Sequence, residues 1–194
     1  MVSQTDRAYE VIKSRIVNLE LTPGSVLKET ELMNELGLGR TPIREALQRL
    51  ARDDLVVIQP RRGMYVSEIG VTDLKHIFEA RIPLEMWAAR LAAERISSEQ
   101  LDEFERIISR IESYEGADLA NQLMESDRQV HEIITQSTGN KFFIDGVRWL
   151  YDLTARIWRL APNPLAGSRE IIQHHHELLD ALRKRDGDLA ELIM

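Results

Sequence analysis

The chain has 194 residues, of which 43% are hydrophobic and 29% charged, the composition of an ordinary globular protein. It contains no cysteine, which excludes disulfides, thiolate metal sites and cysteine nucleophiles. The net charge of -7 argues against a general polyanion-binding protein. No signal peptide and no run of transmembrane length is recognisable, so we expect a cytoplasmic protein without a membrane partner.

The charge is unevenly distributed along the chain. Residues 1–70 hold 10 Lys and Arg against 10 Asp and Glu, whereas residues 71–194 hold 15 against 22. Between Arg40 and Arg62 there are six arginines and only three acidic residues. This pattern is typical of a small nucleic-acid-binding module followed by an acidic domain.

The first helical segments are marked by apolar spacing and by turn residues. The opening segment predicts a helix, and its apolar side chains recur at helical spacing: Tyr9, Ile12, Ile16 and Leu19. A Pro-Gly pair at 23–24 then predicts a turn, and "KETELMNELGLG" predicts a short helix that ends at glycine.

A third helix is predicted in "RTPIREALQRLARDD". Thr41 suits the N-cap and Pro42 the first helical position, and the apolar stripe consists of Ile43, Ala46, Leu47 and Leu50. "LVVIQPRRGMYVSEI" follows, with β-branched runs on either side of a turn, so it predicts a hairpin. Three helices and a hairpin indicate a winged helix-turn-helix domain over residues 1–69.

The remaining chain predicts an all-α helical bundle over residues 70–194, which makes the protein mainly α. The stretch "SEIGVT" is the expected junction between the two domains. Six helices are expected, at 72–95, 98–113, 117–137, 140–160, 168–185 and 187–194.

The predicted third helix carries candidate DNA-reading residues. In a helix-turn-helix the second helix of the motif enters the major groove, and its N-terminal residues face the bases. We therefore expect base contacts from Arg40, Thr41, Arg44 and Gln48. Phosphate contacts are expected from Arg49, Arg52 and the wing residues Arg61 and Arg62. Gly63 allows the tight wing turn to approach the DNA backbone closely. Any single arginine could instead be solvated surface, but the whole arrangement favours binding to double-stranded DNA.

Residues 7–66 resemble the winged-helix domain of the GntR family of bacterial transcription regulators. The resemblance rests on the Pro-Gly turn, on "RTPIREAL" and on the Arg-Arg-Gly wing. Two positions depart from the family pattern. Gly39 replaces the usual Ser, which removes a possible phosphate contact, and Asp54 replaces the usual Gly. Asp54 should be tolerated because Asp adopts the left-handed conformation more readily than most residues.

Three consecutive histidines, at 174–176, are separated by helical periodicity. Because each residue advances about 100° around a helix, His175 falls at the centre of an apolar face that contains Ile171, Leu178 and Leu182. His174 and His176 fall about 100° to either side of it, on the flanks. The middle histidine is therefore expected to point inward.

Two other predicted helices carry polar pairs on apolar faces. Asp127 and His131 lie one turn apart, as do Arg81 and Glu85. An Asp at i with a His at i+4 can clamp a metal ion, whereas either pair could also be a buried ion pair that stabilises little. Together with His175 they form five inward polar residues on three helices. This pattern favours a ligand or metal pocket over a purely structural core.

Residues 71–194 resemble the FCD effector domain of FadR-type GntR regulators, in its six-helix, VanR-like variant. The segments concerned are "EARIPLE", "DRQVHEII", "TGNKFF" and "HHELLDALRKRDGDLAE". The resemblance implies a divalent metal of the Zn, Ni or Mn class held by Asp127, His131 and His175. It also implies a small organic acid effector near Arg81 and Glu85, and a homodimer. The family's further histidine on the last helix would lie just after Met194.

The expected function is therefore that of a DNA-binding transcription regulator, and the resemblance implies a repressor. Its affinity for operator DNA would be controlled by a small carboxylate bound beside a metal. Alternatives are a metal-sensing regulator, a bundle used only for dimerisation, and a metal-dependent hydrolase. The hydrolase is disfavoured because no separate general base stands out and the winged helix would be unexplained.

Overall fold

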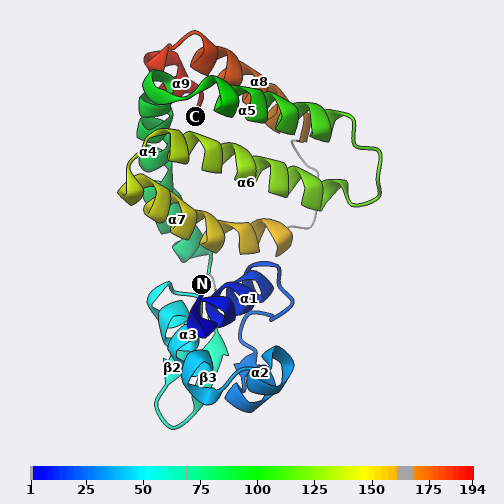
Figure 1. Cartoon of the computed structure of the whole chain (residues 1–194), viewed down its shortest axis with the longest axis vertical. Coiled ribbons are helices and arrows are strands. Elements are labelled where there is room, and N and C mark those ends of the chain that lie inside the picture. Colours follow the sequence, from blue (N-terminus) through cyan, green and yellow to red (C-terminus); the bar gives the residue numbers. More distant parts are fainter. Residues whose placement is uncertain (1, 69, 161–167) are drawn as a thin grey trace. The chain divides into compact units, whose positions relative to one another are not determined.

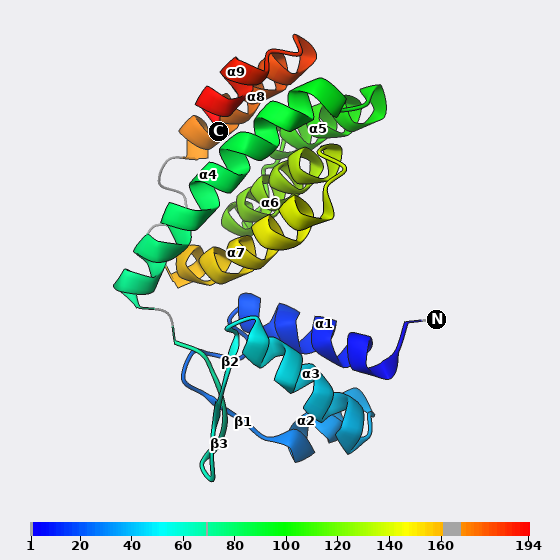
Figure 2. The same cartoon turned by 90° about the vertical axis from the view of Figure 1, so that its left-hand side faces the viewer.

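The computed structural model describes residues 2–68, 70–160 and 168–194 (Figures 1 and 2). By their internal contacts the residues form two compact units. The first comprises Met1–Leu74 with Asp152–Leu160, and the second Lys75–Tyr151 with Ala161–Met194. The domain limits 1–69 and 70–194 stay a prediction.

The first unit contains the predicted winged helix-turn-helix. Its elements are α1 (Gln4–Val17), β1 (Val26–Leu27), α2 (Glu29–Leu36), α3 (Arg40–Arg52), β2 (Val56–Gln59) and β3 (Gly63–Val66). The hairpin of β2 and β3 is antiparallel, with Ile58 opposite Met64. The two residues of β1 add a further strand on the other side of β3, so the order in the described sheet is β1-β3-β2. A two-residue strand leaves no periodic signal in the sequence, so it could not be predicted from apolar spacing.

The core of the first unit lies between α1 and α3. Ile12 and Ile16 are completely buried, as predicted, and the fully buried residues of α3 are Ile43, Ala46, Leu47 and Leu50. Leu19 was wrongly placed in the helical stripe. The helix ends at Val17, and Leu19 has a left-handed φ of 62° beyond it.

The helix α3 starts two residues earlier than predicted. Arg40 is the first helical residue and Gly39 is the N-cap, so Thr41 is not the cap and Pro42 stands third in the helix. Proline is tolerated there because backbone N–H groups in the first turn have no intrahelical acceptor. At the other end, Asp54 has a φ of 60°, which confirms the left-handed conformation expected at this position.

After β3, all the regular structure in the described residues is helical, and most of it lies in the second unit. Six helices begin and end within two residues of the predicted limits: α4 (Val71–Arg95), α5 (Ser98–Glu112), α6 (Leu119–Ser137), α7 (Lys141–Leu160), α8 (Ser168–Arg183) and α9 (Gly187–Ile193). Ser97 and Gln100 form a capping box that fixes the start of α5.

Small residues of α4 allow its neighbours to approach closely. Four completely buried alanines line one side of this helix, at 88, 89, 92 and 93. They pack in one core with Phe104 of α5, Ile134 of α6 and Leu182 of α8. The sides of α4, α6 and α8 that face this core are the sides on which the predicted polar residues lie. No helix in the described ranges is long and apolar enough to cross a membrane.

Candidate functional site

The side chains predicted to read bases lie on the exposed face of α3. Arg40, Thr41, Arg44 and Gln48 are all exposed, and the Arg40 and Arg44 side chains retain 66% and 61% of their accessible surface. The opposite face of the helix carries the buried apolar stripe. The helix is therefore anchored on one side and open on the other, as a recognition helix must be to enter a groove.

The predicted wing residues form the tip of the hairpin between β2 and β3. Arg61, Arg62 and Gly63 are exposed there. Arg61 and Gly63 have left-handed φ values of 64° and 113°, and glycine adopts such a conformation without steric cost. The Tyr65 hydroxyl donates a hydrogen bond to the Arg62 carbonyl at 3.0 Å. Two arginines on a short, braced loop are suited to phosphate contacts.

Arg49 is engaged inside the first unit. Its Nη1 donates a hydrogen bond to Asp6 Oδ1 at 2.7 Å, and its guanidinium lies 4.2 Å from the centre of the Tyr9 ring. The Tyr9 hydroxyl in turn donates to Asp53 Oδ2 at 2.8 Å. These contacts tie α1 to α3. The phosphate contact predicted for Arg49 would have to compete with them.

In the second unit, the five predicted polar residues come together from α4, α6 and α8. Arg81, Glu85 and His175 are buried, with exposed fractions of 6%, 6% and 5%. The His131 side chain is 15% exposed and that of Asp127 is 30% exposed. Periodicity had placed each residue on an inner face, and the packing of three helices brings those faces together.

The five side chains form a continuous chain of contacts. Arg81 Nε donates to Glu85 Oε1 at 2.9 Å. The same oxygen forms an ion pair with His131 Nδ1 at 2.9 Å. The Nε2 atoms of His131 and His175 lie 3.6 Å and 3.3 Å from Asp127 Oδ1. Two imidazoles therefore converge on one carboxylate oxygen.

These contacts shift the pKa values of the charged groups in opposite directions. Burial alone would lower the pKa of His131, but the charges of Glu85 and Asp127 outweigh it and raise the pKa to about 10. Burial would raise the pKa of Asp127, yet the two histidines hold it well below its usual range. These pKa shifts favour the protonated form of His131 and the ionised form of Asp127 at neutral pH.

Tyr151 of α7 belongs to the same cluster, although it was not predicted from the sequence. Its hydroxyl donates to Asp127 Oδ2 at 3.0 Å and lies 3.2 Å from the Met124 carbonyl oxygen. The Arg81 guanidinium carbon stands 4.6 Å from the centre of its ring. A single tyrosine on an apolar helix is typical of core packing, so the sequence offered no indication of this contact with Asp127.

A hollow of about 110 Å³ opens beside the convergent nitrogens. Its polar side consists of Asp127, His131, His174 and His175, and its apolar side of Val130, Ile171, Leu178 and Met194. The predicted orientation of the three histidines is confirmed: His175 is buried, whereas its two neighbours are exposed. His174 borders the hollow, and His176 Nε2 lies 2.8 Å from Glu112 Oε1 outside it.

The donor set suits a divalent metal in its chemistry. Imidazole nitrogens and a carboxylate oxygen are ordinary ligands, and neighbouring ligands of a tetrahedral ion stand about 3.4 Å apart when the bonds are about 2.1 Å. The separations from Asp127 Oδ1 to the two Nε2 atoms are close to this value. As the side chains stand, no three ligating groups in the described ranges form a metal cluster. Metal binding therefore requires them to turn toward a common point.

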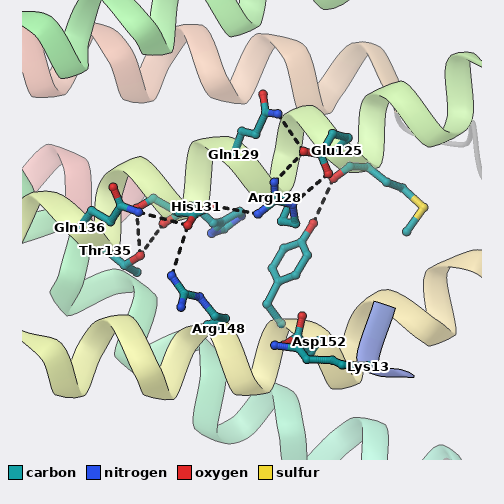
Figure 3. Close-up of polar contacts among 12 residues, drawn as sticks. Lys13, Glu125, Arg128, Gln129, His131, Thr135, Gln136, Arg148 and Asp152 are labelled. Atoms are coloured by element: carbon teal, nitrogen blue, oxygen red, sulfur yellow. Dashed lines mark hydrogen bonds and ion pairs between the residues drawn. The ribbon is translucent and has the colours of Figure 1, made fainter. Parts of the chain in front are cut away.

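A separate row of ion pairs runs along the exposed side of α6. Figure 3 shows Arg128, which contacts Glu125 at 2.6 Å and Glu132 at 2.7 Å, and Arg148 of α7, which contacts Glu132 at 3.2 Å. These side chains are between 31% and 50% exposed. Pairs of this kind contribute little individually, so we interpret this row as a solvated face outside the hollow.

A winged helix-turn-helix with exposed arginines, joined to a helical domain with a polar hollow, defines a DNA-binding transcription regulator. Residues 4–66 match the gntR family of bacterial regulatory proteins, and residues 76–194 match the FCD domain. The chain belongs to the GntR family, and its second domain is of the FCD type.

Individual relatives agree with this assignment. The transcriptional repressor RspR of Escherichia coli is 27% identical over 186 residues, covering 96% of this chain and 82% of its own length. The repressor NanR of Cronobacter sakazakii is 30% identical over 213 residues, covering 96% and 79%. The solved structure of E. coli McbR superposes with a TM-score of 0.87 at 26% identity, covering 100% of this chain and 92% of that one. These relatives are transcription regulators and not enzymes, which sets the hydrolase alternative aside.

Proposed function

We propose that this regulator represses transcription and that a small carboxylate, bound beside a divalent metal in the second unit, controls its affinity for operator DNA. The observation that carries the proposal is the convergence of His131 Nε2 and His175 Nε2 on Asp127 Oδ1 at the wall of a hollow. Two relatives, RspR and NanR, are named transcriptional repressors, which supports repression as the direction of control.

In this proposal Asp127, His131 and His175 hold an ion of the Zn, Ni or Mn class. A bound divalent ion would supply the positive charge that attracts a carboxylate into the hollow. Glu85 lies 2.9 Å from His131 Nδ1, on the far side of the ring from Nε2. A carboxylate in that position orients the imidazole and makes it a stronger ligand.

Arg81 has an indirect part in this arrangement. It is buried, bound to Glu85 and stacked on Tyr151, and it is not among the residues that line the hollow. We propose that Arg81 acts by holding Glu85 and Tyr151 in place and by adding positive charge behind them. The effector's carboxylate then meets the metal side of the hollow, and Val130, Ile171 and Leu178 contact its apolar part.

At the DNA end, we propose that a homodimer reads a palindromic operator. Helix-turn-helix dimers place two recognition helices about one DNA turn apart, so protein symmetry is matched by operator symmetry. Arg40, Thr41, Arg44 and Gln48 would contact base edges, and the wing would contact phosphates. Sedimentation equilibrium tests the oligomeric state, and a monomer at operator-binding concentrations would contradict this part.

Control of DNA affinity by the effector is a thermodynamic coupling between two sites. It requires the effector to bind more tightly to one of two arrangements of the dimer. By reciprocity, operator DNA must then change the affinity for the effector by the same factor. Measuring effector affinity with and without operator DNA tests this requirement directly.

The proposal is tested by metal analysis of the purified protein, followed by thermal melting with a panel of small carboxylates and with Zn²⁺, Ni²⁺ or Mn²⁺ alone. We expect bound metal, and stabilisation by at least one carboxylate that disappears in Asp127→Asn. Asp145→Asn is a matched control, because Asp145 is an exposed carboxylate of α7 that pairs with Lys141. Equal metal content and equal stabilisation in both variants would overturn the metal and effector site.

The same samples separate the alternative functions. Operator binding that responds to the metal ion alone, with no further response to carboxylates, would identify a metal sensor. Operator binding that responds to neither would identify a bundle that serves only assembly.

A further inference from the structure

Glu29, the first residue of α2, lies between the two leading arginines of α3. Its Oε2 is 4.0 Å from Arg40 Nε and its Oε1 is 4.0 Å from Arg44 Nε. One carboxylate therefore faces two guanidinium groups, one oxygen to each. The Glu29 side chain is 24% exposed, whereas the arginines are 66% and 61% exposed, so the carboxylate is the more enclosed member of the group.

The electrostatics of this group favour a fixed spacing of the arginines. Arg40 and Arg44 lie one helical turn apart, where like charges repel each other. A shared carboxylate offsets that repulsion and attracts both side chains to the same place. At 4.0 Å the contacts are longer than hydrogen bonds, so they attract the guanidinium groups without using their N–H donors.

This spacing matters for reading DNA. Residues four apart on a helix are separated by about 6 Å along its axis. Bases on one strand follow each other at about 3.4 Å, so two arginines held one turn apart can address base pairs one or two steps apart. Arginine reads guanine through two parallel hydrogen bonds, and both bonds form only when the guanidinium group is held in the correct orientation.

We propose that Glu29 is a positioning residue for sequence discrimination: it holds Arg40 and Arg44 in register on the reading face. Its negative charge also repels DNA phosphates in every sequence context. Glu29 thus lowers affinity for all DNA and raises the preference for the operator, which is a means of rejecting wrong sequences. This inference relies on the reading role proposed above for the two arginines and is independent of the effector site.

The test compares Glu29→Gln with Glu31→Gln in the full chain. Glu31 is a suitable control because it carries the same charge on the same helix, is 59% exposed and pairs with Lys28 at 2.7 Å instead of with α3. Dissociation constants are measured for a site selected in vitro with the unaltered protein and for a shuffled duplex of equal length, each over a range of salt concentrations.

We expect Glu29→Gln to bind the shuffled duplex more tightly than the unaltered protein does. The ratio of the dissociation constant for the shuffled duplex to that for the selected site should fall about tenfold, the size of one good base contact. Glu31→Gln should leave the ratio unchanged within about twofold. Equal ratios in the two variants would overturn the inference. Thermal melting of both variants checks that they fold. If Glu29→Gln is unstable, Glu29→Asp is measured in its place. This variant keeps the charge but shortens its reach, and it should give an intermediate ratio. A Glu29→Asp ratio equal to that of the unaltered protein would also overturn the inference.

Arg44→Ala separates this inference from the reading role itself. If Arg44→Ala loses the preference for the selected site but Glu29→Gln keeps it in full, the reading role of Arg44 stands and the positioning role of Glu29 does not. Full discrimination in Arg44→Ala would remove the reading role and the inference together.

Discussion

The Tyr151 hydroxyl donates a hydrogen bond to Asp127 Oδ2 at 3.0 Å, while the other oxygen of the same carboxylate faces the Nε2 atoms of His131 and His175. One side of Asp127 is thus fixed by α7 and the other is directed toward α6 and α8. The carboxylate can neither rotate nor withdraw without breaking one of these contacts.

Tyr151→Phe should therefore weaken metal binding without unfolding the protein. The variant keeps the ring beneath Arg81 and removes only the hydroxyl. Loss of an outer-shell partner typically costs about 10–100-fold in metal affinity, and we expect a loss in that range. Calorimetric titration with Zn²⁺ measures it. Tyr114→Phe, which removes a hydroxyl from the loop before α6, should have no effect, and an equal loss there would contradict the role of Tyr151.

The three histidines at 174–176 should differ sharply in their contribution to metal content. His175 is buried with Nε2 toward Asp127, whereas His176 pairs with Glu112 outside the hollow. We expect His175→Ala to lose bound metal and His176→Ala to retain it, as measured by elemental analysis after gel filtration. His174→Ala should retain metal and alter only carboxylate affinity, because its side chain borders the hollow. Similar metal loss in all three would point to a surface cluster instead.

Arg49→Ala should destabilise the first unit because it removes a brace between α1 and α3. The stacking of Arg49 on Tyr9 alone is worth about 0.5–1 kcal/mol at a partly exposed position. Urea unfolding measures the loss, and Arg52→Ala, an exposed residue in the last turn of the same helix, should cost less. If Arg49→Ala changed the salt dependence of DNA binding but not stability, the phosphate contact predicted from the sequence would be the better assignment.

Arg44→Ala and Arg62→Ala should affect DNA binding in different ways. Arg44 is expected to contact bases, so its loss should reduce the operator preference by about tenfold or more. Arg62 is on the wing, and its loss should weaken binding to all sequences and lower the slope of log affinity against log salt by about one. Binding curves on selected and shuffled duplexes at several salt concentrations distinguish the two. An equal loss of preference in both variants would contradict this division.

Most of the fold could be predicted from the sequence because helices are governed by local spacing. Apolar residues at helical intervals, together with glycine, proline and serine at the ends, placed all six helices that follow β3 within two residues of their observed limits. The same periodicity determined which of three adjacent histidines points inward. The local signal was insufficient for the two residues of β1, and it placed the N-cap of α3 two residues too late, at Thr41 instead of Gly39.

Only the tertiary structure decided which residues meet. Periodicity gives the face of each helix but not the partner that covers it, since that depends on how separate helices pack. The contact of Tyr151 with Asp127 joins α7 to α6, that of Arg49 with Asp6 joins α3 to α1, and Glu29 reaches from α2 to two arginines of α3. The inward position of a polar residue is thus a property of its own helix, whereas its chemical role is a property of the helices packed around it.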